Sequence, residues 1–183
     1  AQTTPHPLAL EVLNAKGTLL VVIDNLRYDQ FNIIEKTITK YYKKQDETAY
    51  CSILPTATQY ARNSIFSGLM PLEMSQKHPN LWKDDTDEDG KNLYEEEFFK
   101  AQLQRLRQNI KFSYHKITNL KNGKHLTDNF NTVKENDLTV VVYNFVDMLS
   151  HSKTEMEVIK ELASDDKAYR SLTNSWFMNS PLL

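Results

Sequence analysis

Thr18-Leu-Leu-Val-Val-Ile23 is a continuous apolar run that is rich in β-branched residues. Runs of this kind are typical of a parallel strand whose two faces are both covered. A second run of the same character, Leu138-Thr-Val-Val-Val-Tyr143, lies far along the chain. Helical spacing of apolar residues follows the first run, at Phe31, Ile34 and Ile38. Because strands alternate with helices, the sequence predicts an α/β domain with a mostly parallel sheet flanked by helices on both faces.

The remaining segments predict the other elements of this domain. Two further strands are expected at Ala49–Leu54, where Cys51 would be buried, and at Phe112–Ile117. Helices are expected within Pro55–Gly68, Asn92–Asn109 and Leu126–Val133, with one long helix over Thr154–Phe177 and a turn at Asn122-Gly123. Residues 1–16 are interpreted as a linker, and residues 17–183 as the domain itself.

Composition narrows the class of protein. The chain has 183 residues, of which 40% are hydrophobic and 25% charged, which is typical of a soluble globular domain. A net charge of −2 gives no basic field that would favour DNA binding. A single cysteine excludes an internal disulfide framework and fits a reducing compartment, so a cytoplasmic location is expected. No apolar run approaches the roughly 20 residues that span a bilayer, and no membrane association is expected.

Chemically useful side chains occur where three of the predicted strands end. Asp24 follows the first strand, Thr58 follows Pro55 after the second, and Asp147 follows the last. In parallel sheets, ligand sites form beyond the carboxyl ends of the strands. Structural roles are also open, because Asp24 is a suitable helix cap and either Thr56 or Thr58 can cap the helix after Pro55.

Asp147 and His151 are four residues apart, a spacing that places two side chains on one face of a helix. A carboxylate and an imidazole form a normal ligand set for zinc or a similar divalent ion. Together with Thr58 and Asp24, they suggest metal-assisted phosphoryl transfer. A metal would lower the pKa of a threonine hydroxyl, and two metals about 4 Å apart could hold both the attacking and the leaving oxygen.

Three stretches resemble the alkaline phosphatase superfamily: Val22-Ile-Asp24-Asn-Leu-Arg27, Pro55-Thr-Ala-Thr58 through Ser67-Gly68, and Asp147-x-x-x-His151. The likeness is greatest to the PglZ domain, and it covers nearly the whole chain. Asp24 to Gln30 and Leu54 to Asn63 look like the matching stretches of PorX-type response regulators. In that family a receiver domain precedes a PglZ output domain, and the proteins regulate type IX secretion.

The resemblance implies a role for each matching residue. Thr58 would be the nucleophile and would touch one zinc ion, with Asp24 as a carboxylate ligand of the same ion. Asp147 and His151 would bind a second zinc ion. Related phosphodiesterases hold the phosphoryl oxygen with an asparagine three residues after the nucleophile. Ala61 stands there in this sequence, so Arg62 or Asn63 is suggested as the compensating hydrogen-bond donor, with Arg27 as a further candidate.

One motif of the superfamily does not occur in the sequence. The Asp-His-Gly segment and a further histidine, which supply the remaining metal ligands, are missing. The chain therefore resembles the first part of a PglZ domain. We expect this piece alone to bind metal weakly and to be inactive or nearly so.

Two other functions are consistent with the sequence. The first is a non-catalytic regulatory module, in which the same fold presents a surface to a protein partner. The second is calcium binding at Asp85-x-Asp87-x-Asp89-Gly90 with Glu96, which matches the EF-hand pattern, although Pro79 and Trp82 leave little room for an entering helix. In the enzyme interpretation the substrate is a phosphate ester or nucleotide-type compound. The sequence does not fix the oligomeric state, and a homodimer is one option.

Overall fold

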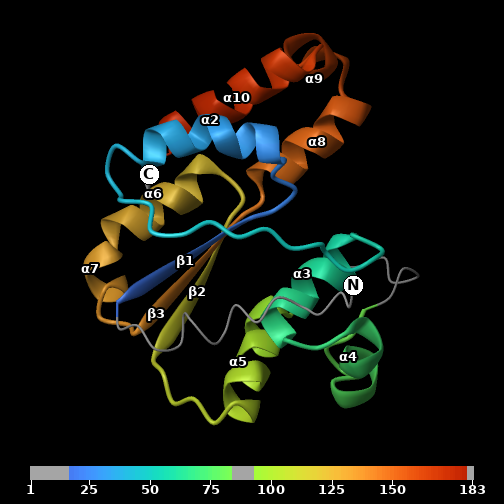
Figure 1. Ribbon diagram of the computed structural model, residues 1–183, viewed down its shortest axis with the longest axis vertical. Coiled ribbons are helices and arrows are strands. Elements are labelled where there is room, and N and C mark those ends of the chain that lie inside the picture. The colour runs from blue at the N-terminus through green and yellow to red at the C-terminus, as the bar shows by residue number, and fades with distance from the viewer. Residues whose placement is uncertain (1–16, 84–92, 181–183) are drawn as a thin grey trace. The chain divides into compact units, whose positions relative to one another are not determined.

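A computed structural model describes residues 17–83 and 93–180, which form two compact units (Figure 1). Unit 1 comprises Ala1–Thr18, Thr48–Phe112 and Asn136–Leu138. Unit 2 comprises Leu19–Glu47, Ser113–Glu135 and Thr139–Leu183.

Three strands form a parallel sheet in the order β1-β3-β2, namely β1 (Thr18–Ile23), β3 (Leu138–Tyr143) and β2 (Phe112–Ile117). Backbone hydrogen bonds show that the strands are parallel. They join the start of β3 to the starts of β1 and β2, and the end of β3 to the ends of β1 and β2. All six residues of β3 are buried, as expected for an apolar central strand. The α/β class and three of the four predicted strands are thereby confirmed.

The core of unit 2 lies between the sheet and helices from both halves of the sequence. Its central helices are α2 (Tyr28–Ile38) and α10 (Asp166–Met178), which pack against each other. Ile34 of α2 and Phe177 of α10 meet Val141 and Tyr143 of β3 in one hydrophobic cluster. Leu126 of α6 (Leu120–Asp128) and Val133 of α7 (Phe130–Val133) extend it.

The prediction of one long helix over Thr154–Phe177 is wrong. Three helices occupy this region: α8 (Phe145–Glu155), α9 (Glu157–Leu162) and α10. Met156 is extended, with φ −112° and ψ 119°, which ends α8. The carboxylate of Asp165 accepts a hydrogen bond from the backbone of Ala168 at 2.7 Å and so caps a new helix. The prediction of a turn at Asn122-Gly123 is also wrong, because both residues lie within α6.

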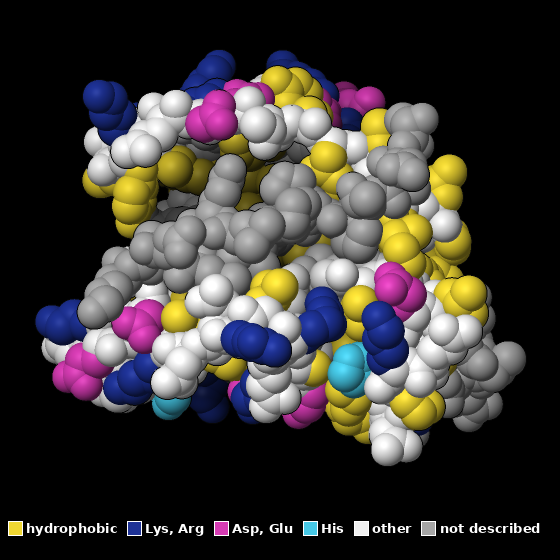
Figure 2. Space-filling view, turned by 60° about the horizontal axis from the view of Figure 1, so that its bottom comes forward, with side chains coloured by type: hydrophobic (Ala, Val, Ile, Leu, Met, Phe, Trp, Pro, Cys, Tyr) yellow, Lys and Arg dark blue, Asp and Glu magenta, His cyan; other side chains and the backbone are white. Residues whose placement is uncertain are grey.

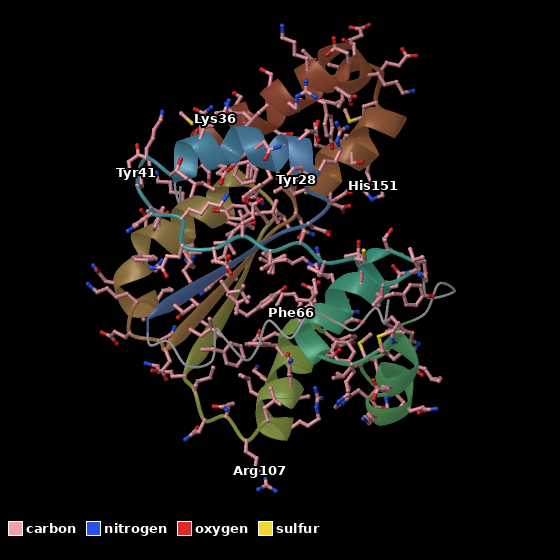
Figure 3. All side chains as sticks on the ribbon, in the orientation of Figure 1. Tyr28, Lys36, Tyr41, Phe66, Arg107 and His151 are labelled. Carbon is pink, nitrogen blue, oxygen red and sulfur yellow. The ribbon has the colours of Figure 1, made fainter. Side chains whose placement is uncertain are left out.

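In unit 1, helix α3 (Thr58–Ser67) packs against α5 (Glu95–Arg105), and α4 (Pro71–Lys77) lies beside α3. Phe66 of α3 meets the ring of Phe99 edge-on, with 6.1 Å between ring centroids (Figure 3). The strand expected at Ala49–Leu54 does not form, and Cys51 is exposed rather than buried. Apolar character alone does not make a strand, because a strand also needs a neighbour to complete its hydrogen bonds.

A network of charged side chains joins the start of α2 to the start of α10. Arg27 contacts Asp29 at 2.6 Å and Asp166 at 2.9 Å, and Arg170 contacts Asp29 at 3.0 Å. Beneath this network, the buried Gln30 donates to the hydroxyl of Thr173 at 2.9 Å. The two helices are therefore held together by polar contacts as well as by their apolar faces.

This network predicts a loss of stability in acid. The Arg27 side chain hydrogen-bonds the Asp29 carboxylate and holds its pKa well below the ordinary value. A carboxyl group with a depressed pKa in the folded state stabilises the fold above its unfolded pKa of about 4, and that stabilisation is lost as the pH falls further. We therefore expect the melting temperature of Asp29→Asn to fall less than that of the wild type between pH 5 and pH 2. Asp128→Asn, at an exposed position on α6, is the control, and equal acid sensitivity of all three proteins would contradict the prediction.

Candidate functional site

Thr58 is the first residue of α3 and is half-buried. The N-cap residue is Ala57, whose side chain makes no capping hydrogen bond, so the predicted capping role of Thr56 or Thr58 is wrong. Thr58 therefore occupies the first position of the helix and is not its N-cap residue. A helix N-terminus carries a partial positive charge and suits a phosphate group.

Asp24 lies directly after β1 in unit 2 and is half-buried. Its backbone N–H donates to the carbonyl oxygen of Tyr143 at 3.0 Å, which joins the ends of β1 and β3. The next residue, Asn25, adopts a left-handed conformation with φ 57° and turns the chain toward α2. Arg27 is the N-cap residue of α2 and pairs with Asp29 and Asp166, so its side chain is engaged in structural contacts.

Asp147 and His151 lie one turn apart on α8, which begins shortly after β3 ends. The imidazole Nε2 of His151 is 3.5 Å from a carboxylate oxygen of Asp147, as the sequence spacing predicts. The Asp147 side chain is 23% exposed and that of His151 71% exposed. The His151 side chain points outward from α8 (Figure 3). Both groups are therefore accessible to a metal ion.

Arg62 and Asn63, the suggested phosphoryl-oxygen donors, are both 3% exposed. Arg62 lies one turn after Thr58 and donates from Nε to the carboxylate of Glu95 on α5. Glu95 is itself 1% exposed, and the sequence analysis did not single it out. Its only sequence signal is its position at the start of a helix, where a glutamate is ordinary. Its importance comes from a contact with a residue distant in sequence.

The predicted site residues fall into both units. Thr58, Arg62 and Asn63 belong to unit 1, whereas Asp24, Asp147 and His151 belong to unit 2. Within unit 2 the structure brings Asp147 and His151 together and places Asp24 at the end of the strand next to β3.

The donor chemistry of Asp147 and His151 fits two ligands of a zinc ion. In residues 17–83 and 93–180, no group of three histidine, cysteine or acidic side chains could hold a metal ion. The predicted calcium ligands Asp85, Asp87 and Asp89 lie outside the described residues. Glu96, the last position of that pattern, is on α5 and pairs with Lys100 at 2.8 Å.

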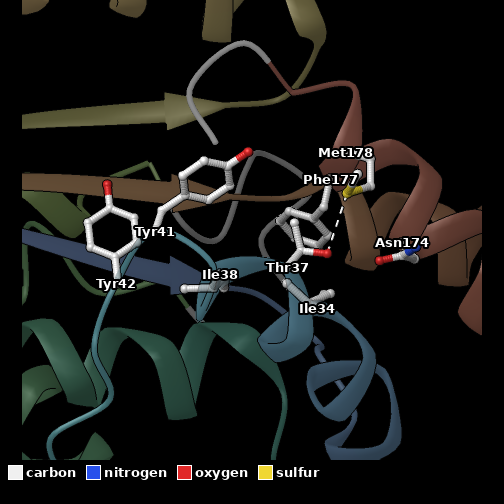
Figure 4. A pocket seen from close by; sticks show the side chains of 8 residues that line it. All are labelled: Ile34, Thr37, Ile38, Tyr41, Tyr42, Asn174, Phe177 and Met178. Atoms are coloured by element: carbon white, nitrogen blue, oxygen red, sulfur yellow. Dashed lines mark hydrogen bonds between the residues drawn. The ribbon is translucent and has the colours of Figure 1, made fainter.

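Other surface features do not involve the predicted site residues. On the face shown in Figure 2, basic and acidic side chains are interspersed, in keeping with the small net charge. A pocket of about 500 Å³, including its open mouth, lies between the ends of α2 and α10 (Figure 4). It is lined by apolar, hydroxyl and amide side chains, namely Ile34, Thr37, Ile38, Tyr41, Tyr42, Asn174, Phe177 and Met178. This lining contains no carboxylate or imidazole and does not suit hydrolytic chemistry.

Comparison with protein families matches residues 9–181 to the BREX system PglZ alkaline phosphatase-like domain. The match covers nearly all of the sequence, and the observed α/β fold agrees with it. The chain belongs to the PglZ alkaline phosphatase-like family and has a phosphoesterase-like fold. Curated proteins gave no significant match. None of the helices that the structure describes has the length and hydrophobicity of a membrane-spanning segment.

Proposed function

We propose that this domain is a metal-dependent phosphoryl-transfer hydrolase, a phosphodiesterase or phosphatase, with Thr58 as its nucleophile. The observation that supports this most is the position of Thr58, a half-buried residue at the N-terminus of α3, where the N-cap residue Ala57 supplies no side-chain hydrogen bond. Backbone N–H groups there can stabilise the negative charge that develops on a transferred phosphoryl group.

The other site residues would bind the metals. Asp147 and His151 would supply a carboxylate and an imidazole to one zinc ion, and Asp24 would supply a carboxylate to another. Bound zinc lowers the pKa of a coordinated hydroxyl and neutralises charge on phosphoryl oxygens. Asp147 lies on α8 and Asp24 directly after β1, and both residues belong to unit 2.

In its protein context, we propose that the domain is the output module of a cytoplasmic response regulator. A receiver domain on its N-terminal side would control it, and type IX secretion would be the regulated process. The substrate would be a phosphate ester or nucleotide-type compound. These proposals rest on the likeness of Asp24–Gln30 and Leu54–Asn63 to PorX-type regulators.

A second candidate is a non-catalytic interaction module. It is favoured by exposed apolar side chains on and near α9, where Met156 is 53%, Val158 63% and Leu162 59% exposed. Exposed apolar side chains in one region often mark a protein-binding surface. This function requires the α9 surface but neither Thr58 nor metal.

Zinc dependence tests the enzymatic proposal. Full-length protein is stripped of metal, and hydrolysis of bis-(p-nitrophenyl) phosphate is measured during zinc titration. We expect Asp147→Asn to raise the zinc concentration for half-maximal activity about tenfold or more, because a neutral amide is a poorer ligand than a carboxylate. Asp128→Asn, exposed on the same unit, should leave the titration unchanged. Identical titrations for wild type and Asp147→Asn would remove Asp147 from the metal site.

A further inference from the structure

The interface between α3 and α5 in unit 1 contains an unusual number of polar groups for a buried helix contact. Glu95 and Arg62 form an ion pair in which the side chains are 1% and 4% exposed. Gln102 on α5 and Ser64 on α3 are also buried, at 4% and 0% exposure. The Oε1 atom of Gln102 and the Oγ atom of Ser64 have no hydrogen-bond partner within the described residues.

The end of α3 is fixed to the same helix at two further points. Arg105 of α5 donates from Nη2 to the carbonyl oxygen of Ser67 at 2.6 Å. Gly68 ends α3 in the left-handed conformation, with φ 62°, and approaches Gln102 so closely that a Cβ atom there would lie 2.5 Å from its amide nitrogen. The stretch of α3 from Arg62 to Gly68 therefore makes specific contacts with α5.

Buried charges are a poor way to increase stability, because the loss of hydration offsets most of the attraction between them. Their best-attested benefit is to fix the register of two packed elements. An apolar interface, in contrast, tolerates small slips and rotations, and it loses uniqueness before it loses stability. The Arg62–Glu95 pair thus favours one register of α3 on α5.

We propose that Glu95, acting through Arg62, is a positioning residue for Thr58. Arg62 lies four residues after Thr58, one helical turn along α3. A contact that holds Arg62 in place on α5 therefore also sets the position of Thr58 along and around the axis of α3. A shift of α3 by one residue would rotate the Thr58 hydroxyl by about 100°. This inference rests on the proposed function of Thr58, and it assigns Arg62 a role different from direct contact with the phosphoryl group.

Replacing both charges tests the proposal, since it removes the register contact without leaving one member of this pair buried alone. In Arg62→Met/Glu95→Met we expect the full-length protein to stay folded while kcat falls about 10²-fold, with KM and zinc affinity within about twofold of wild type. The matched control is Glu96→Met/Lys100→Met, which removes the exposed ion pair of the same helix and should keep full kcat. A folded Arg62→Met/Glu95→Met protein with wild-type kcat would overturn the proposal.

Glu95→Gln provides a second measurement that does not depend on the double variant folding. If Arg62 positions Thr58, Glu95→Gln lowers kcat and leaves KM unchanged. If Arg62 instead contacts the substrate directly, Glu95→Gln leaves KM unchanged or lower and does not reduce kcat. Hydrogen exchange of the hydrogen-bonded amides of α3, from Tyr60 onward, should become about tenfold faster, while amides of β3 remain unchanged. Unchanged exchange and kcat would refute the positioning role. Because exchange needs no activity, it also separates this result from a failure of Thr58 as nucleophile.

Discussion

Thr58→Ala is expected to reduce phosphodiester hydrolysis by the full-length protein about 10³-fold or more, because the nucleophilic oxygen is removed while the fold is retained. The methyl group of alanine fits the half-buried position, and the helix loses no cap, since Thr58 does not cap α3. Steady-state kinetics with saturating zinc would measure the loss, and circular dichroism would confirm that the variant is folded.

Thr56→Ala is the matched control, because it removes an exposed threonine two residues earlier in the same loop. It should retain wild-type kcat. Thr58→Ser should keep measurable activity, because it preserves a hydroxyl at the same position. If Thr58→Ala hydrolysed the substrate at the wild-type rate, Thr58 would not be the nucleophile. Such a variant with intact control of secretion would favour the interaction module.

Glu95→Ala is expected to lower the free energy of unfolding by about 3–5 kcal/mol, since it leaves the Arg62 guanidinium buried without its carboxylate. The side chains of this pair are only 1% and 4% exposed, so water cannot readily replace the lost partner. Urea unfolding followed by circular dichroism would measure the effect.

Glu96→Ala is the matched control on the next residue of α5. Its pairing with Lys100 involves side chains that are 39% and 52% exposed, and surface ion pairs contribute about 0–1 kcal/mol. We expect Glu96→Ala to unfold within about 1 kcal/mol of the wild type. Equal destabilisation by the two substitutions would show that burial of the Arg62–Glu95 pair does not set its energetic role.

Much of the sheet can be predicted from sequence because its central strand is covered on both faces. The apolar run of β3 is buried on both sides, whereas the similar run of β1 lies at an edge of the sheet and its residues are partly buried or exposed. Helical spacing after β1 identifies α2. The Asp147 and His151 contact is equally predictable, because it depends only on the local geometry of one helix.

Two of the differences arise from contacts that are not local, and the third from a local signal that was missed. The run Ala49–Leu54 has strand character, but it remains irregular and exposes Tyr50 and Cys51. The break before α10 had a local signal that was missed, the capping residue Asp165. The partner of Arg62 could not be inferred from spacing at all, since Glu95 belongs to a different helix and only the packing of α3 on α5 brings the two charges together.

The exposed thiol of Cys51 has a practical consequence. It is the only cysteine in the sequence, and it precedes Thr58 on the same irregular segment that leads into α3. A maleimide fluorophore would therefore attach at one known position without any substitution. Its emission would report the arrival of substrate or zinc near the start of α3, so ligand binding could be followed in real time, even in variants that no longer turn over.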